Sequence, residues 1–130
     1  MISVIYTIVS VFLIIYLSFS VINLRRSLGI SVGDGNHEDL QHARGAQSNA
    51  VEYIPIALLL LYALEFNGAG NWIIHLAGIS LVTGRIIHAH GMLNKNVKKR
   101  VLGMQVTIYT FIALSVLNLV YLPYEELLTL

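Results

Sequence analysis

The side chains in this sequence that could do chemistry stand inside apolar segments, at helical spacing. Asn49 and Glu52 are three residues apart and Tyr53 is four from Asn49, so a helix would place all three on one face. Arg85 and His88, again three apart, share a face of a second apolar segment. Polar groups are costly at such positions unless they face a bundle interior or water, so each one is a candidate for a site.

Further cations are expected near the same groups. Arg25 and Arg26 follow the first apolar segment, Arg44 stands five residues before Asn49, and Arg100 opens the last apolar segment. Gln47 adds an amide, although it aligns less well with the Asn49 face. Guanidinium groups bind carboxylates through paired hydrogen bonds. One carboxylate, several amides and many cations together predict a binding site for a small anionic or zwitterionic molecule.

Plainer interpretations stay open for several of these residues. Glu52 and Arg85 could form a structural ion pair inside the bundle. Arg25 and Arg26 could anchor a helix end to lipid headgroups, and the lysines at positions 95, 98 and 99 are typical of that role. A metal site is not predicted, because His88 and His90 point to different faces of a helix and the chain contains no cysteine.

The elements that must position these groups are membrane helices. The chain has 130 residues, of which 56% are hydrophobic and 12% charged, against roughly 25% charged in soluble domains. Apolar segments run over about 2–24, 40–66, 72–92 and 101–122. About 20 residues of helix cross the hydrocarbon core of a bilayer. The sequence therefore predicts an all-α fold, an integral membrane four-helix bundle that forms a single domain over residues 1–130.

The charges of the loops predict the orientation of the bundle. The first loop follows two arginines, the third contains three lysines and leads to Arg100, and the second, "NGAGN", is uncharged. Basic loops stay in the cytoplasm. Loops one and three are therefore expected in the cytoplasm and both termini outside, which in a bacterial inner membrane means the periplasm. Asn36 is expected to cap the start of the second helix.

Three sequence elements resemble one known family. They are "LQHARGAQSNAVEYIPIALLLLYALEFNGAG", "GRIIHAHG" and "KKRVLGM", together with the "GDGN" loop that the small bacterial members share. The chain resembles the MAPEG family, the membrane-associated proteins in eicosanoid and glutathione metabolism, along its whole length. The resemblance implies a homotrimer of four-helix bundles, with glutathione bound between subunits at the cytoplasmic side.

The resemblance also implies roles for individual residues. Asn49 and Glu52 match the pair that contacts glutathione in the family, and Gln47 and Tyr53 match further contacts. Arg100 resembles the arginine thought to stabilise the glutathione thiolate. The remaining binding positions implied are Arg25, Arg85 and His88. The family usually has arginines where this chain has His42 and Gly45, and often a tyrosine where it has Met92.

The expected chemistry follows from the thiol. Only a few per cent of a thiol with a pKa near 8.5 is thiolate at neutral pH, and a guanidinium beside it lowers that pKa. The resemblance implies a glutathione transferase or peroxidase that acts on hydrophobic electrophiles or lipid hydroperoxides from the bilayer. The alternative is a non-catalytic membrane protein of the same fold that binds a lipid or a protein partner. A small multidrug-type transporter is disfavoured, because the first helix lacks the buried glutamate of that class.

Overall fold

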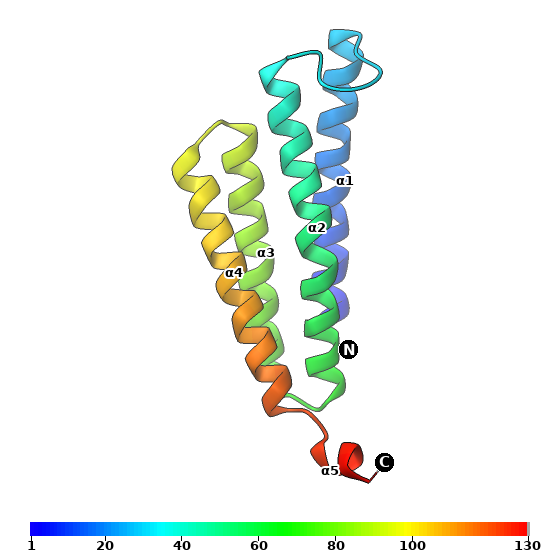
Figure 1. Ribbon diagram of the computed structural model, residues 1–130, viewed down its shortest axis with the longest axis vertical. Coiled ribbons are helices and arrows are strands. Elements are labelled where there is room, and N and C mark those ends of the chain that lie inside the picture. Colours follow the sequence, from blue (N-terminus) through cyan, green and yellow to red (C-terminus); the bar gives the residue numbers. More distant parts are fainter. Residues whose placement is uncertain (130) are drawn as a thin grey trace.

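The computed structural model describes residues 1–129, apart from the side chains of residues 126 and 127. Four long helices run up and down, and a short helix follows the last of them (Figure 1). Their bounds are α1 Ser3–Leu28, α2 Glu38–Phe66, α3 Asn71–Leu93, α4 Val97–Val120 and α5 Tyr124–Leu128. The all-α four-helix prediction is confirmed, and α5 was not expected from the sequence.

The bundle consists of two antiparallel pairs, α1 with α2 and α3 with α4, joined through the packing of α2 on α3. Within the described residues α1 and α4 do not contact each other. The α1–α2 and α3–α4 loops lie at one end of the bundle, which we call the basic end. Both chain termini and the α2–α3 loop lie at the other (Figure 1). Every lysine and arginine except Arg85 belongs to the basic end.

All four long helices are long and apolar enough to cross a membrane. Their outer faces are also apolar, since large side chains such as Phe12, Leu59 and Tyr109 are each more than 60% exposed. A helix with apolar residues on its outer face is stable in hydrocarbon, where its backbone groups are satisfied internally. The chain is therefore an integral membrane protein.

Helix boundaries differ from the predicted ones where local capping decides them. α1 continues one turn past residue 24 and ends at Gly29, which adopts a left-handed conformation with φ of 66°. α4 begins at Val97, four residues earlier than expected, because the side chain of Asn96 accepts a hydrogen bond from the Lys99 N–H at 3.1 Å. The prediction that Asn36 caps α2 is wrong. Its own N–H is bound by Asp34 in a turn, and α2 begins two residues later.

Glycines bring α3 and α4 into close contact. A Cβ atom on Gly103 of α4 would overlap the backbone of His88, and one on Gly91 of α3 would overlap the backbone of Arg100. Small residues at a helix crossing allow this approach, which is the usual basis of helix association in membranes. This close contact fixes the positions of His88 and Arg100 relative to each other along the axis of the bundle.

Two polar contacts tie the bundle together at its ends. Glu65, near the end of α2, accepts hydrogen bonds from the backbone N–H groups of Ile2 and Ser3 and so caps α1. At the basic end, Lys95 of the α3–α4 loop lies 2.7 Å from Asp39 and 3.3 Å from Glu38 at the start of α2. The hydrogen bond with Asp39 raises the pKa of Lys95, so this contact joins the two helix pairs across the neutral pH range.

Candidate functional site

The centre of the predicted site is Arg85, a cation almost completely buried between α2, α3 and α4. The side chain is 2% exposed. Its Nε donates to the Thr107 hydroxyl of α4 at 2.9 Å, and its Nη1 donates to the side-chain oxygen of Asn49 on α2. The guanidinium also lies over the Tyr53 ring, 5.3 Å from its centre. These four side chains form what we call the Arg85 cluster.

Neighbouring side chains complete the walls of this cluster. The ring of Tyr53 packs edge-on against Phe111 of α4, with their centres 5.8 Å apart. His88, one turn along α3 from Arg85, is only 4% exposed. The structure therefore brings Asn49, Tyr53 and Arg85 together, and His88 lies buried one turn further along α3.

The charge of Arg85 has no carboxylate partner among the side chains that the structure describes. Its Nη2 is buried and has no hydrogen-bond partner among them. The structural ion pair with Glu52 that the sequence left open does not form. The Glu52 carboxylate is exposed and accepts a hydrogen bond from Ser48, one turn earlier on the same helix, at 2.8 Å. An arginine stays protonated at any physiological pH, so this is a permanent buried cation with a free donor.

The other predicted binding residues line a separate cavity between α1 and α2. Its volume is about 700 Å³, and it opens near the basic end. Arg25 lines it and donates to the Ile30 carbonyl at a long 3.4 Å. Gln47 lines it too and donates to Ser18 of α1 at 3.0 Å. The cavity's polar lining is Arg25, Asp34, Gln41, Arg44, Gln47 and Ser48; we call it the α1–α2 cavity.

The structure thus divides the predicted residues between two faces of α2. Gln47 faces α1, whereas Asn49 faces α3. Two residues correspond to a rotation of about 200° around a helix, which accounts for the division. Glu52 lies between the two faces and is exposed to the outside of the bundle. Within one chain, Arg25 and Gln47 are therefore not part of the Arg85 cluster.

Arg100 lies in the first turn of α4 and is exposed. Its backbone contacts Gly91 of α3, so it is at the level of the end of α3, one turn beyond His88. Lys98 and Lys99 share this exposed turn. Arg100 therefore lies on the basic side of the Arg85 cluster, and the described residues show no hydrogen bond between them.

Sequence reasoning missed Thr107 and Asp34. Thr107 is fully buried, donates to the Gly103 carbonyl at 2.8 Å and accepts from Arg85. The four-residue spacing of Gly103 and Thr107 is a small-residue pattern typical of helix contacts and was the available signal. Asp34 stands in the "GDGN" loop, and nothing in its sequence context indicates that it lines a cavity.

Two positions where the chain departs from the family pattern contact each other. A Cβ atom on Gly45 of α2 would lie 2.7 Å from the terminal methyl group of Met92 on α3. The absence of a side chain at position 45 therefore makes room for the flexible thioether. His42, the third departure, lies 3.8 Å from Glu38 one turn earlier.

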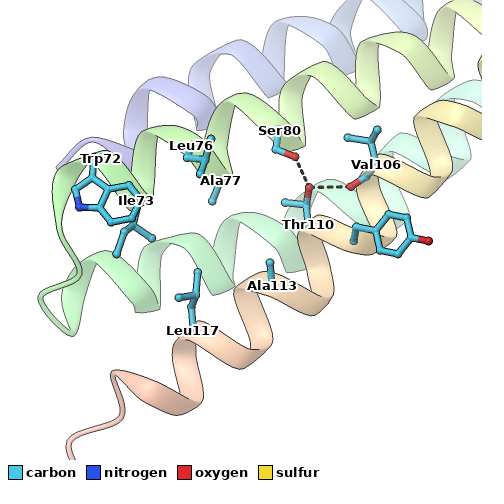
Figure 2. Close-up of a pocket in the computed structure, with 10 residues that line it drawn as sticks. Trp72, Ile73, Leu76, Ala77, Ser80, Val106, Thr110, Ala113 and Leu117 are labelled. Carbon is cyan, nitrogen blue, oxygen red and sulfur yellow. Dashed lines mark hydrogen bonds between the residues drawn. The ribbon is translucent and has the colours of Figure 1, made fainter.

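A third hollow is apolar and lies between α3 and α4, toward the end with the termini. Its volume is about 530 Å³ (Figure 2). Trp72 stands at one end and Val106 toward the other, and the Ser80 and Thr110 hydroxyls, 2.6 Å apart, lie between them. Thr110 also donates to the Val106 carbonyl at 2.8 Å. Val106 and Thr110 flank Thr107, so α4 separates this groove from the Arg85 cluster.

Comparison with known proteins agrees with this architecture. The model of the MAPEG family matches residues 3–120. Two relatives, each called Inner membrane protein YecN, come from Escherichia coli strain K12 and from the O6:H1 strain CFT073. Each is 38% identical to this chain over 130 residues, which cover 100% of the chain and 99% of the relative. The chain therefore belongs to the MAPEG family.

Proposed function

We propose that this protein binds glutathione and transfers it to hydrophobic electrophiles, or uses it to reduce lipid hydroperoxides. The observation that carries the proposal is the buried Arg85, whose Nη2 donor and positive charge have no carboxylate partner among the described residues. Burying an uncompensated charge is strongly unfavourable. A ligand carboxylate would compensate it, and glutathione has two carboxylates. Membership in a family named for glutathione metabolism supports this choice.

The site is proposed to be shared between copies of the chain. The Arg85 cluster and the α1–α2 cavity lie on different faces of α2, so one tripeptide cannot contact both within a single chain. In a ring, each interface joins two different faces of the subunit. A homotrimer, as the family resemblance implies, would place the α1–α2 cavity of one copy beside the Arg85 cluster of the next. Glu52, exposed between the two faces, would lie at that junction.

The proposed chemistry begins with the thiol. Arg100 would lie beside the bound sulfur and favour the thiolate. The thiolate attacks an electrophilic carbon and forms a carbon–sulfur bond, while a leaving group departs from that carbon with its bonding electron pair, or the electron pair of an activated double bond shifts away and takes up a proton. With a lipid hydroperoxide, two glutathione molecules would be oxidised to the disulfide while the hydroperoxide is reduced to the alcohol and water. The hydrophobic reactant would come from the bilayer.

The location is proposed from charge and from the relatives. The relatives are named as inner membrane proteins, and we place this chain in the same membrane. The basic end would face the cytoplasm, where positively charged loops stay, and both termini would face the periplasm. This orientation would place the α1–α2 cavity and the Arg85 cluster toward the cytoplasmic side of the membrane.

Calorimetric titration of glutathione into the detergent-solubilised protein tests the proposal. Glu52→Gln should weaken binding about tenfold or more, since hydrogen bonds to a charged group contribute about 1.5–3 kcal/mol. The fold should be unaffected, because among the described residues the Glu52 carboxylate is hydrogen-bonded only to Ser48, on the same helix. Glu125→Gln in α5 removes the same charge far from the site and is the matched control. Absence of glutathione binding by the wild-type protein would refute the proposal.

A non-catalytic lipid- or partner-binding protein is the second candidate. It is favoured by Gly45, where the family usually has an arginine and where Met92 now fills the space. Such a protein would bind no glutathione at millimolar concentration, and the same titration separates the two candidates.

A further inference from the structure

The α1–α2 cavity carries charges of both signs. Arg25 and Arg44 supply two guanidinium groups, and Asp34 supplies the one carboxylate among the lining residues. Gln41, Gln47 and Ser48 add neutral hydrogen-bonding groups. A cavity built to bind a simple anion gains nothing from a carboxylate in its wall, because like charges repel. Asp34 balances part of the charge of Arg44, from which it lies 3.8 Å, and it also offers an acceptor to a positively charged group of a ligand.

The Asp34 carboxylate is held in place by its own loop. One of its oxygens, Oδ1, accepts a hydrogen bond from the Asn36 N–H at 2.9 Å, which closes a turn. Gly33 and Gly35 on either side adopt left-handed conformations, with φ of 73° and 57°. Earlier in the loop, Ile30 packs on the apolar cluster of Val21, Leu40 and Ala43. The loop is thus anchored to the helices, and Asp34 is 32% exposed at the cavity.

The second carboxylate oxygen of Asp34 remains able to accept a hydrogen bond. Oδ2 lies 3.8 Å from Nη1 of Arg44, which is too far for a direct hydrogen bond. Arg44, 45% exposed, forms a long salt bridge with Asp34 at this distance, and both groups keep hydrogen-bonding capacity for a ligand. Arg25 makes only the 3.4 Å contact with a backbone carbonyl. The cavity presents one carboxylate oxygen and two guanidinium groups that a ligand can engage.

We propose that the α1–α2 cavity binds a zwitterionic α-amino-acid group, with Asp34 receiving its ammonium and Arg25 and Arg44 its carboxylate. Asp34 thereby determines specificity, selecting ligands that carry both charges over simple anions. The inference rests on the proposed function and deepens it. In glutathione the group concerned is the γ-glutamyl end, so the opposite end and the thiol point toward the Arg85 cluster of the neighbouring copy.

The experiment compares two ligands that differ in one group. Glutathione is titrated beside its glutaryl analogue, which lacks only the ammonium, into the full-length protein and Asp34→Asn. An asparagine oxygen still accepts from the Asn36 N–H, so the loop is retained. Asp34→Asn should bind glutathione about tenfold more weakly and the analogue equally well or better. Glu38→Gln, a neighbouring acid that pairs with Lys95 and does not line the cavity, is the control and should change neither affinity.

The outcomes separate this inference from the proposed function. Equal glutathione affinity in the wild type and Asp34→Asn would overturn the role of Asp34 and leave glutathione binding intact. A parallel loss of both ligands in Asp34→Asn would also overturn it, because a collapsed loop affects both alike. Failure of the wild type to bind either ligand would overturn the inference together with the proposed function.

Discussion

At the scale of single residues, Arg85 is the position that stability alone does not explain. Its permanently charged side chain lies inside the bundle and is only 2% exposed. Its Nη2 donor has no hydrogen-bond partner among the described residues. Apolar side chains of similar volume often replace buried charges with neutral or stabilising effect. A buried cation that the fold does not need is expected where a ligand needs it.

The first prediction concerns Arg85→Met. Thr107 keeps its bond to the Gly103 carbonyl, and only the Asn49 oxygen loses its donor. The free energy of unfolding should therefore stay within about 2 kcal/mol of the wild type. Glutathione affinity should fall at least tenfold, because a charge-assisted hydrogen bond is lost. Thermal unfolding in detergent and calorimetry measure the two effects.

The control for this variant is Arg26→Met, which removes an exposed arginine at the end of α1. Arg26→Met should change neither the free energy of unfolding nor the glutathione affinity. A large loss of stability in Arg85→Met, with unchanged glutathione affinity in the protein that remains folded, would mean that Arg85 serves the fold.

The second prediction concerns Arg100→Ala. The guanidinium should favour the thiolate of bound glutathione, so its removal should raise the pKa of that thiol. At neutral pH the thiolate fraction should fall about tenfold if the interaction contributes about 1.4 kcal/mol. The ultraviolet absorbance of the thiolate, followed against pH, measures this. Lys98→Ala, which removes an exposed charge from the same turn, should leave the titration unchanged. An equal shift in both variants would indicate a general charge effect.

At the scale of elements, the contact between α3 and α4 sets the geometry of the Arg85 cluster. Gly103 allows the two backbones to approach at His88, and this approach brings Thr107 within 2.9 Å of Arg85. A helix crossing of this kind has no room for an added methyl group, since membrane helices associate through close packing.

Gly103→Ala should therefore separate the two helices. Overpacking of a tight contact costs about 1–3 kcal/mol, and we expect a lower thermal midpoint together with weaker glutathione binding. Gln105→Ala, an exposed position two residues later on α4, should have little effect on either. An unchanged thermal midpoint for Gly103→Ala would show that the crossing is looser than its geometry indicates.

The sequence predicted the helices well and their rotation poorly, for one physical reason. Long apolar segments identify membrane helices, so all four long helices were found. On a helix with apolar residues on every side, however, hydropathy does not determine which face is turned inward. Asn49 and Glu52 differ by only about 60° around α2. Packing decided that Asn49 and not Glu52 meets Arg85, and that Gln47 belongs to another face.

At the scale of the whole molecule, the proposed function depends on the oligomer, because each glutathione site is proposed to combine the α1–α2 cavity of one copy with the Arg85 cluster of another. The α1–α2 cavity and the Arg85 cluster lie on different faces of α2, and the exposed Glu52 stands between them. A single chain would offer a ligand one half or the other. A ring in which each copy presents its cavity to the cluster of the next would complete every site.

Coexpression of Arg25→Ala with Arg85→Met, followed by glutathione titration of the purified oligomers, tests this account most directly. Each variant alone, and the double variant in one chain, should bind glutathione at least tenfold more weakly than the wild type. In mixed oligomers an intact cavity and an intact cluster meet at about a quarter of the interfaces, and that fraction of wild-type binding should return. Mixed oligomers that bind no better than either variant alone, beside a wild type that binds, would contradict a site shared between copies.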